Sequence, residues 1–137
     1  MTVVQPYLHF NGRCEEAIEF YKGAVGAKVE MLMHFKDAPD KSMIKPESEN
    51  KVMHATLRVG DSMFMASDGD CKGSAKFEGF SMSLTVSSEG DAKKFFDALS
   101  AGGQVRMPLT KTFFSPAFGM LADKFGLGWM IMVPGKM

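Results

Sequence analysis

The sequence lacks a charge imbalance, a long apolar run and a dense set of cysteines. Its 137 residues carry 16 basic and 16 acidic side chains, so the formal net charge is zero. A neutral balance gives no electrostatic reason to bind nucleic acid or an anionic membrane surface. Apolar runs such as 129–133 are far shorter than a bilayer requires. We therefore expect neither a nucleic-acid partner nor a membrane partner.

The two cysteines, Cys14 and Cys71, are too few for a disulfide framework. Free thiols of this kind are typical of a reducing compartment. Residues 1–6 contain no basic segment followed by an apolar core, so we expect no signal peptide. These features together predict a cytoplasmic protein.

Methionine is abundant, with 13 residues. Unbranched thioether side chains fill irregular gaps in a core, and they also adapt to varied ligands in a pliable apolar pocket. Both interpretations stay open at the level of composition. The length is that of one ordinary domain.

The first half predicts a strand at 6–10, a helix at 14–25 and a strand at 28–35. Apolar residues at helical spacing support the helix, and Gly26 is placed to end it. The polar, proline-containing stretch 36–51 is expected to be a long surface loop, either simply solvated or acting as a lid. Strands at 52–59 and 63–67 follow, joined by a turn at Gly60-Asp61.

The second half repeats this order. It predicts a strand at 80–86, a helix at 91–101 that ends before Gly102-Gly103, and strands at 104–111, 118–122 and 129–133. The two helices align residue for residue: Ala17, Phe20 and Tyr21 match Ala92, Phe95 and Phe96. We expect Phe20 and Phe95 to fix each helix to its sheet.

Each half is thus a βαβββ module. A helix on one face of a four-stranded sheet leaves the other face in need of a partner. The predicted fold is α+β, with two βαβββ modules in tandem whose sheets form a curved trough and whose helices lie outside.

Local motifs add a family resemblance. Five segments resemble the PhnB-like branch of the vicinal-oxygen-chelate superfamily. They are Pro6-Tyr7-Leu8-His9-Phe10-Asn11-Gly12, residues 16–21, Met53-His54-Ala55, residues 65–69 and Asp123-Lys124-Phe125-Gly126. That superfamily includes glyoxalase I, extradiol dioxygenases and bleomycin-resistance proteins. The resemblance implies one glyoxalase-like domain over 1–137, with module one at 1–70 and module two at 77–137. It also implies a homodimer.

The resemblance further implies where a metal would bind in superfamily enzymes. The corresponding positions hold Gln5, Ser81, Met130 and either Met63 or Met65. Thioethers and neutral oxygens are poor ligands for a hard or borderline divalent ion. We therefore expect no metal or other cofactor. A site built from His9 and His54 is the alternative.

Strand alternation separates a polar face from an apolar one. The candidate ligand-binding residues on the polar face are Tyr7, His9, His54, Thr56, Arg58, Met65, Ser67, Ser81, Ser83 and Met130. Such a mixture of aromatic, thioether, hydroxyl and basic groups suits a small organic molecule. A structural role is the favoured alternative for His9, His54 and Arg58, and Asp68-Gly69 has the chemistry of a simple turn. Cys14 is expected to be partly buried and inert.

The sequence leaves three hypotheses for the function of the protein. The first is a metal-free protein that binds a small organic molecule in the trough. The second is a metal-dependent lyase, isomerase or dioxygenase that uses non-standard ligands such as Gln5, His9 and His54. The third is a methyltransferase activity, because some domains of this branch carry the label "3-demethylubiquinone-9 3-methyltransferase". The sequence has no glycine-rich strand–loop–helix fingerprint to hold a nucleotide-type methyl donor.

Overall fold

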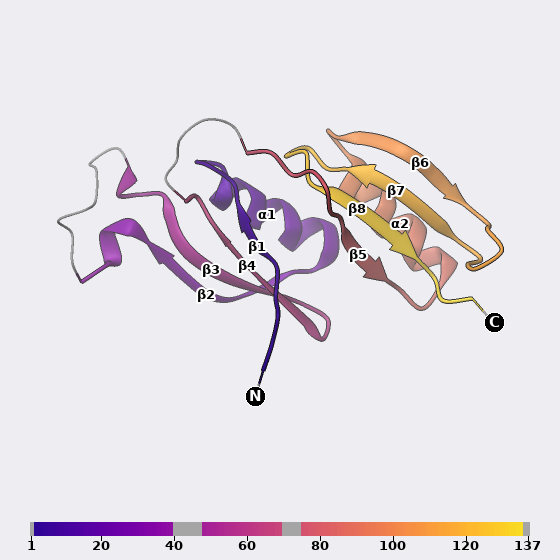
Figure 1. Cartoon of the computed structure of the whole chain (residues 1–137), viewed down its shortest axis with the longest axis horizontal. Coiled ribbons are helices and arrows are strands. Elements are labelled where there is room, and N and C mark those ends of the chain that lie inside the picture. Colours follow the sequence, from indigo (N-terminus) through magenta and orange to yellow (C-terminus); the bar gives the residue numbers. More distant parts are fainter. Residues whose placement is uncertain (1, 40–47, 70–74, 136–137) are drawn as a thin grey trace. The chain divides into compact units, whose positions relative to one another are not determined.

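The computed structural model describes residues 2–39, 48–69 and 75–135 (Figure 1). The chain divides into two compact units, 1–75 and 76–137. Within the described residues, each unit contains one α-helix and one four-stranded mixed sheet, so the fold class is α+β as the sequence predicts. Among the described residues, no helix has the length and hydropathy to cross a bilayer.

Unit 1 follows the predicted order of elements. They are β1 (Tyr7–His9), α1 (Cys14–Val25), β2 (Lys28–His34), the 3-10 helix η1 (Phe35–Asp37), β3 (Val52–Val59) and β4 (Ser62–Ser67). The sheet order is β1-β4-β3-β2. The first strand pairs with β4 in parallel, and the other pairs are antiparallel. The central part of the predicted loop, 40–47, lies outside the described residues.

The bounds of α1 follow from its sequence. A stripe of apolar residues at helical spacing is buried against the sheet, and Gly26 ends the helix with a left-handed φ of 68°. Its beginning is less ordinary, because the side chain of Arg13 at the N-cap pairs with Glu16 and does not cap the helix. The backbone N–H of Cys14 instead donates to the distant Asp68 carboxylate.

Unit 2 repeats this plan with β5 (Met82–Thr85), α2 (Glu89–Ser100), β6 (Gln104–Thr110), β7 (Phe118–Ala122) and β8 (Gly128–Met132). Its sheet order is β5-β8-β7-β6. The helix begins two residues before the predicted start, because the Ser88 hydroxyl accepts the N–H of Asp91 and so caps an earlier turn. The strand β5 is shorter than predicted: pairing with β8 starts only at Met82, and Phe80 is 46% exposed.

One prediction about the core is wrong by one position. Tyr21 and Phe96 are the aromatic residues buried beneath the helices, at 0% and 5% exposure, whereas Phe20 and Phe95 are only half-buried. Successive residues on a helix are rotated by about 100°, so a shift of one position exchanges a core-facing residue for a flanking one. The repeat itself holds, because both members of each aligned pair have the same burial class.

Candidate ligand-binding face

Strand register places the polar side chains of unit 1 on the sheet face opposite α1. Along β3, Ala55 and Leu57 are buried toward the helix, while His54, Thr56 and Arg58 alternate with them and are half-buried. One row across the sheet consists of Tyr7, Met65, Thr56 and Met31. Beside it, His9 pairs with Ser67 and His54 pairs with Met33. We call this surface the open face of unit 1.

Four of the predicted residues meet in one cluster on this face. The Tyr7 hydroxyl lies 2.9 Å from Nδ1 of His54, and Nε2 of His54 lies 3.2 Å from Oγ1 of Thr56. The ring of His9 stacks on the ring of Tyr7, with centroids 5.0 Å apart and planes 19° from parallel. We call Tyr7, His9, His54 and Thr56 the Tyr7 cluster. Its tyrosine is 39% exposed and so accessible to a ligand.

Arg58 lies on the same face with its charge already compensated. Its Nε is 2.7 Å from Oε1 of Glu30 on β2, and its Nη2 contacts the thioether of Met63 at 3.5 Å. A guanidinium that is paired in this way offers less attraction to an anionic ligand than an unpaired one. Arg58 is therefore not a free positive charge on this face.

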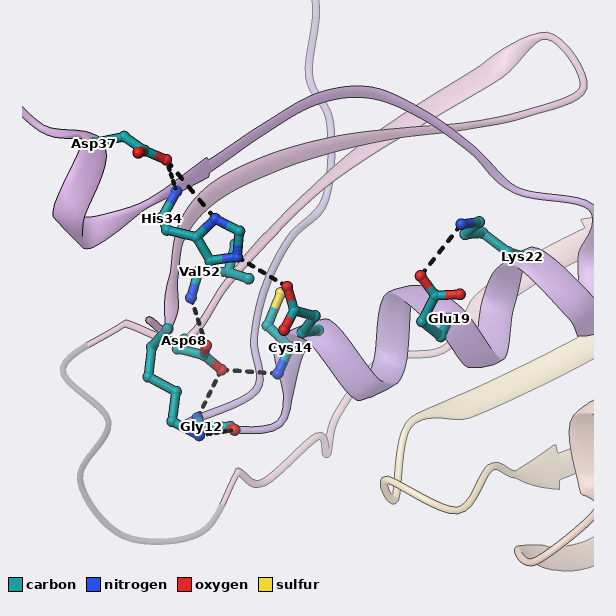
Figure 2. Close-up of polar contacts among 10 residues, drawn as sticks. Gly12, Cys14, Glu19, Lys22, His34, Asp37, Val52 and Asp68 are labelled. Atoms are coloured by element: carbon teal, nitrogen blue, oxygen red, sulfur yellow. Dashed lines mark hydrogen bonds and ion pairs between the residues drawn. The ribbon is translucent and has the colours of Figure 1, made fainter. Parts of the chain in front are cut away.

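Ser67 and Asp68, at the end of β4, have structural roles in unit 1. Ser67 is buried, and its hydroxyl accepts the N–H of Gly69. Asp68 is 1% exposed, and its carboxylate accepts backbone N–H groups from Gly12 at 2.7 Å, Cys14 at 2.8 Å and Val52 at 2.9 Å (Figure 2). The sequence suggested only a turn at Asp68-Gly69. The carboxylate instead joins the start of α1 to β3.

Cys14 and His34 lie away from the open face. Burial raises the pKa of the Cys14 thiol, and the nearby carboxylates of Asp68 and Glu15 raise it further. The thiol is therefore a poor nucleophile, in keeping with the sequence prediction. His34 contacts Glu15, with Nε2 and Oε1 2.9 Å apart, and its backbone N–H donates to Asp37 (Figure 2).

The open face of unit 2 is dominated by thioethers. Ser83 neighbours Met130, and the same row continues through Met120 to Met107. Ser81 precedes β5, and a Cβ added to Gly128 would lie 3.0 Å from its hydroxyl. All three histidines of the chain belong to unit 1, so the face of unit 2 has no imidazole.

A separate open groove lies on the helix side of unit 2, with a volume of about 610 Å³. It runs between α2 and the 108–111 segment of β6 and its continuation. The charges of Lys93 and Asp97 in its wall pair with each other at 3.3 Å. None of the predicted ligand-binding residues lines this groove.

The family model described as 3-demethylubiquinone-9 3-methyltransferase matches residues 2–132. The chain belongs to this family. It is the PhnB-like family that the motifs predicted. Its fold is shared with solved glyoxalase-related structures. The family assignment states descent and fold, and the description of the model does not by itself assign a reaction to the chain.

Relatives of the PhnB-like family match over nearly their whole length. Protein YjdN of Escherichia coli K12 is 33% identical, with 95% of this chain and 94% of that protein covered. The solved structure of PA1353 from Pseudomonas aeruginosa is 38% identical, has a TM-score of 0.87 and covers 99% of this chain and 100% of that one. A PhnB protein from Bacillus cereus, named a putative 3-demethylubiquinone-9 3-methyltransferase, is 26% identical with a TM-score of 0.80 and coverage of 96% and 99%.

The resemblance to the vicinal-oxygen-chelate superfamily implied four positions for metal ligands, and the side chains at these positions bind a divalent ion poorly. Gln5 and the two alternatives Met63 and Met65 lie in unit 1, and Ser81 and Met130 lie in unit 2. None of these side chains is a carboxylate, a thiolate or an imidazole, which supply most of the affinity for zinc, nickel, manganese or iron. Within residues 2–39, 48–69 and 75–135, no three His, Cys, Asp or Glu side chains are grouped to hold an ion. The donors at these positions do not fit the usual metal.

Proposed function

We propose that this PhnB-like protein binds a small, neutral organic molecule on the open faces of its sheets, without the usual metal of the superfamily. The observation that carries the proposal is the composition of these faces. They hold most of the methionines of the chain: Met31, Met33, Met63 and Met65 in unit 1, and Met107, Met120, Met130 and Met132 in unit 2. The composition left two roles open for methionine, and this distribution supports the ligand-binding one.

Thioethers are polarisable and flexible, and they contact aromatic rings favourably. A surface of this kind accommodates a planar apolar body without a rigid pocket. The Tyr7 cluster adds hydrogen-bonding groups beside the methionines, so the ligand is expected to carry at least one oxygen. With Arg58 paired to Glu30, a neutral ring compound satisfies the face better than a carboxylate does.

NMR of protein labelled with 13C in the methionine methyl groups tests this proposal directly. Three probes share one ring system and differ in charge: 2-naphthol, 2-naphthoate and 2-naphthylmethylammonium. We expect 2-naphthol to shift the methyl signals of Met31 and Met65 most strongly. Met53 and Met82 alternate toward the helix-covered faces and serve as internal controls. Unchanged spectra with all three probes at millimolar concentration would contradict the proposal.

A methyltransferase function, as the family description suggests, needs a place for the methyl donor. The strand–helix loops of the two units are the natural candidates. The loop before α1 contains one glycine, Gly12, and the loop before α2, Val86-Ser87-Ser88, contains none. These loops do not support a nucleotide-type cofactor. Calorimetry with S-adenosylmethionine checks this point, and measurable binding would favour the methyltransferase function.

We also propose a cytosolic homodimer. The exposed apolar residues include Val29, Met31 and Leu32 on the edge strand β2, each at about 40% exposure. An apolar edge is commonly covered by a second copy around a two-fold axis. Light scattering at micromolar concentration measures the mass, and a clean monomer would contradict the dimer.

A further inference from the structure

The hydrogen bonds of the Tyr7 cluster form a directed chain. A neutral imidazole has one donor and one acceptor nitrogen, so only two arrangements satisfy both contacts of His54. In the first, the Tyr7 hydroxyl donates to Nδ1 and Nε2–H donates to Thr56. In the second, Thr56 donates to Nε2 and Nδ1–H donates to Tyr7. The first leaves the Tyr7 oxygen ready to accept a proton, and the second leaves its hydroxyl ready to donate one.

The surroundings allow this chain to act on a bound molecule. Tyr7 lies over the strand β4, whose Met65 is its direct neighbour in the register. On the strands of unit 1, the other charged or titratable groups on this side are His9 from β1, Arg58 from β3, and Glu30 and Lys28 from β2. Arg58 and Glu30 pair with each other, so Lys28, at the outer end of β2, is the cation on this side that the pair does not compensate. From β4, the face receives only thioether and hydroxyl side chains.

We propose that Tyr7 and His54 form a proton-accepting pair for a ligand that carries an acidic hydroxyl group, of the phenol or enol class. This inference rests on the proposed function, because the ligand must first occupy the open face of unit 1. The ligand O–H bond breaks and its proton passes to the Tyr7 oxygen, while the Tyr7 proton passes to Nδ1 of His54. Thr56 accepts the hydrogen bond of Nε2–H in the resulting imidazolium.

The step is balanced without any other reactant. One O–H bond of the ligand is exchanged for one N–H bond of His54, and the negative charge of the ligand is matched by the positive charge of the imidazolium. The ligand oxyanion keeps the Tyr7 hydroxyl as its hydrogen-bond donor. Such an interaction with a charged acceptor is stronger than one between neutral groups, and it favours the ionised ligand.

4-Nitrophenol is a suitable probe, because its ionised form absorbs visible light and its neutral form does not. We expect the ionisation midpoint of the bound probe to lie about one pH unit or more below that of the free probe, as one hydrogen bond to an oxyanion allows. Occupancy is measured separately, from the shift of the methionine methyl signals.

Two variants isolate the pair. Tyr7→Phe keeps the ring that stacks on His9 and removes the hydroxyl. His54→Asn keeps a polar atom near the position of Nδ1 but takes no proton at neutral pH. We expect both variants to bind 4-nitrophenol and to lose the shift in its midpoint. The matched controls are Tyr21→Phe, on the buried side of α1, and His34→Asn, at the end of β2, and both are expected to keep the shift.

The outcomes separate the two proposals. If 4-nitrophenol binds to the wild-type protein with an unchanged midpoint, the proton-accepting pair is wrong and the proposed function stands. The same conclusion follows if the shift survives in His54→Asn. If neither 4-nitrophenol nor the naphthalene probes move any methyl signal of the open faces, the proposed function fails and this inference fails with it. Circular dichroism of each variant confirms that it is folded.

Discussion

The carboxylate of Asp68 accepts the backbone N–H of Cys14 at 2.8 Å, and so caps α1 from the far end of β4. Asp68→Ala would leave this N–H and those of Gly12 and Val52 without their acceptor. We expect a loss of about 3–5 kcal/mol in the free energy of unfolding, because buried unpaired groups are costly. Urea denaturation measures it. Asp61→Ala, in the exposed turn between β3 and β4, is the control and should be nearly neutral.

The aromatic side chains on the buried sides of the two helices should contribute similar amounts to the free energy of unfolding. We expect Tyr21→Ala and Phe96→Ala each to lower the free energy of unfolding by about 3–5 kcal/mol, because each leaves a cavity in a buried site. Phe20→Ala and Phe95→Ala, half-buried beside them, should cost less than half as much. If Phe20→Ala proves as costly as Tyr21→Ala, the burial pattern of α1 is misassigned.

Gly119 on β7 is required by close packing. A Cβ at this position would lie 2.7 Å from Cε2 of Phe96 and 3.1 Å from Cδ2 of Leu109. We expect Gly119→Ala to destabilise the protein by about 1–3 kcal/mol through overpacking. Gly23 provides the opposite case, since it lies in α1 with no atom within 4 Å of an added Cβ.

Gly23→Ala should stabilise the protein by about 0.5–1 kcal/mol, because alanine is the better helix former. Thermal unfolding of the two alanine variants gives the sign of each change. Two changes of the same sign would contradict the packing argument.

The Cys14 thiol should be unreactive in the folded protein. The Cys71→Ser variant leaves it as the only thiol, and we expect Ellman's reagent to react at pH 8 only after unfolding. The folded pKa is raised above its ordinary value of 9.0. The unfolded thiol therefore loses its proton first as the pH rises, and stability that is complete below pH 9.0 declines above it.

Denaturation of Cys71→Ser and of the variant that also carries Cys14→Ala, between pH 8 and 10, isolates this contribution. The difference between the two variants should change with pH in the stated direction. A fast reaction of the folded protein with the reagent would show that the thiol is accessible.

Divalent metals should leave the melting temperature nearly unchanged. A metal at a hundredfold excess over its dissociation constant would add about 2.7 kcal/mol of stability, which raises the melting temperature by several degrees in a domain of this size. The donor set of Gln5, Met63 or Met65, Ser81 and Met130 supports no such effect with zinc or nickel. A rise of several degrees that disappears in His9→Ala or His54→Ala would restore the metalloenzyme hypothesis.

The sequence predicts the elements of this fold well, because their signals are local. The stripe of α1 and the glycine after it give both ends of that helix, and alternation along β3 separates its two faces. Which side of each helix faces the sheet is harder to predict. Phe20 and Tyr21 are adjacent and both apolar, so only packing decides which one is buried.

The candidate site was partly predictable for the same reason. Alternation places Tyr7, His54 and Thr56 on one face, but their hydrogen bonds depend on strand order, which brings β1 beside β4 and not beside β2. The role of Asp68 was hidden for a similar reason. An Asp-Gly pair has the same local signature whether its carboxylate faces solvent or receives three backbone groups from distant segments.

The parallel pairing of the first strand with the last strand of each unit sets the order in which the chain can fold. Tyr7 can pair with Met65 only after β4 has been synthesised, and Met82 can pair with Trp129 only after β8 has been synthesised. During synthesis, α1 and the β2–β3 ladder can form early, while β1 stays unpaired until β4 leaves the ribosome. Closing such long loops is slow compared with forming a helix. Premature termination near Gly60 would therefore leave an exposed strand edge on β3 and a solitary β1, a combination prone to aggregation.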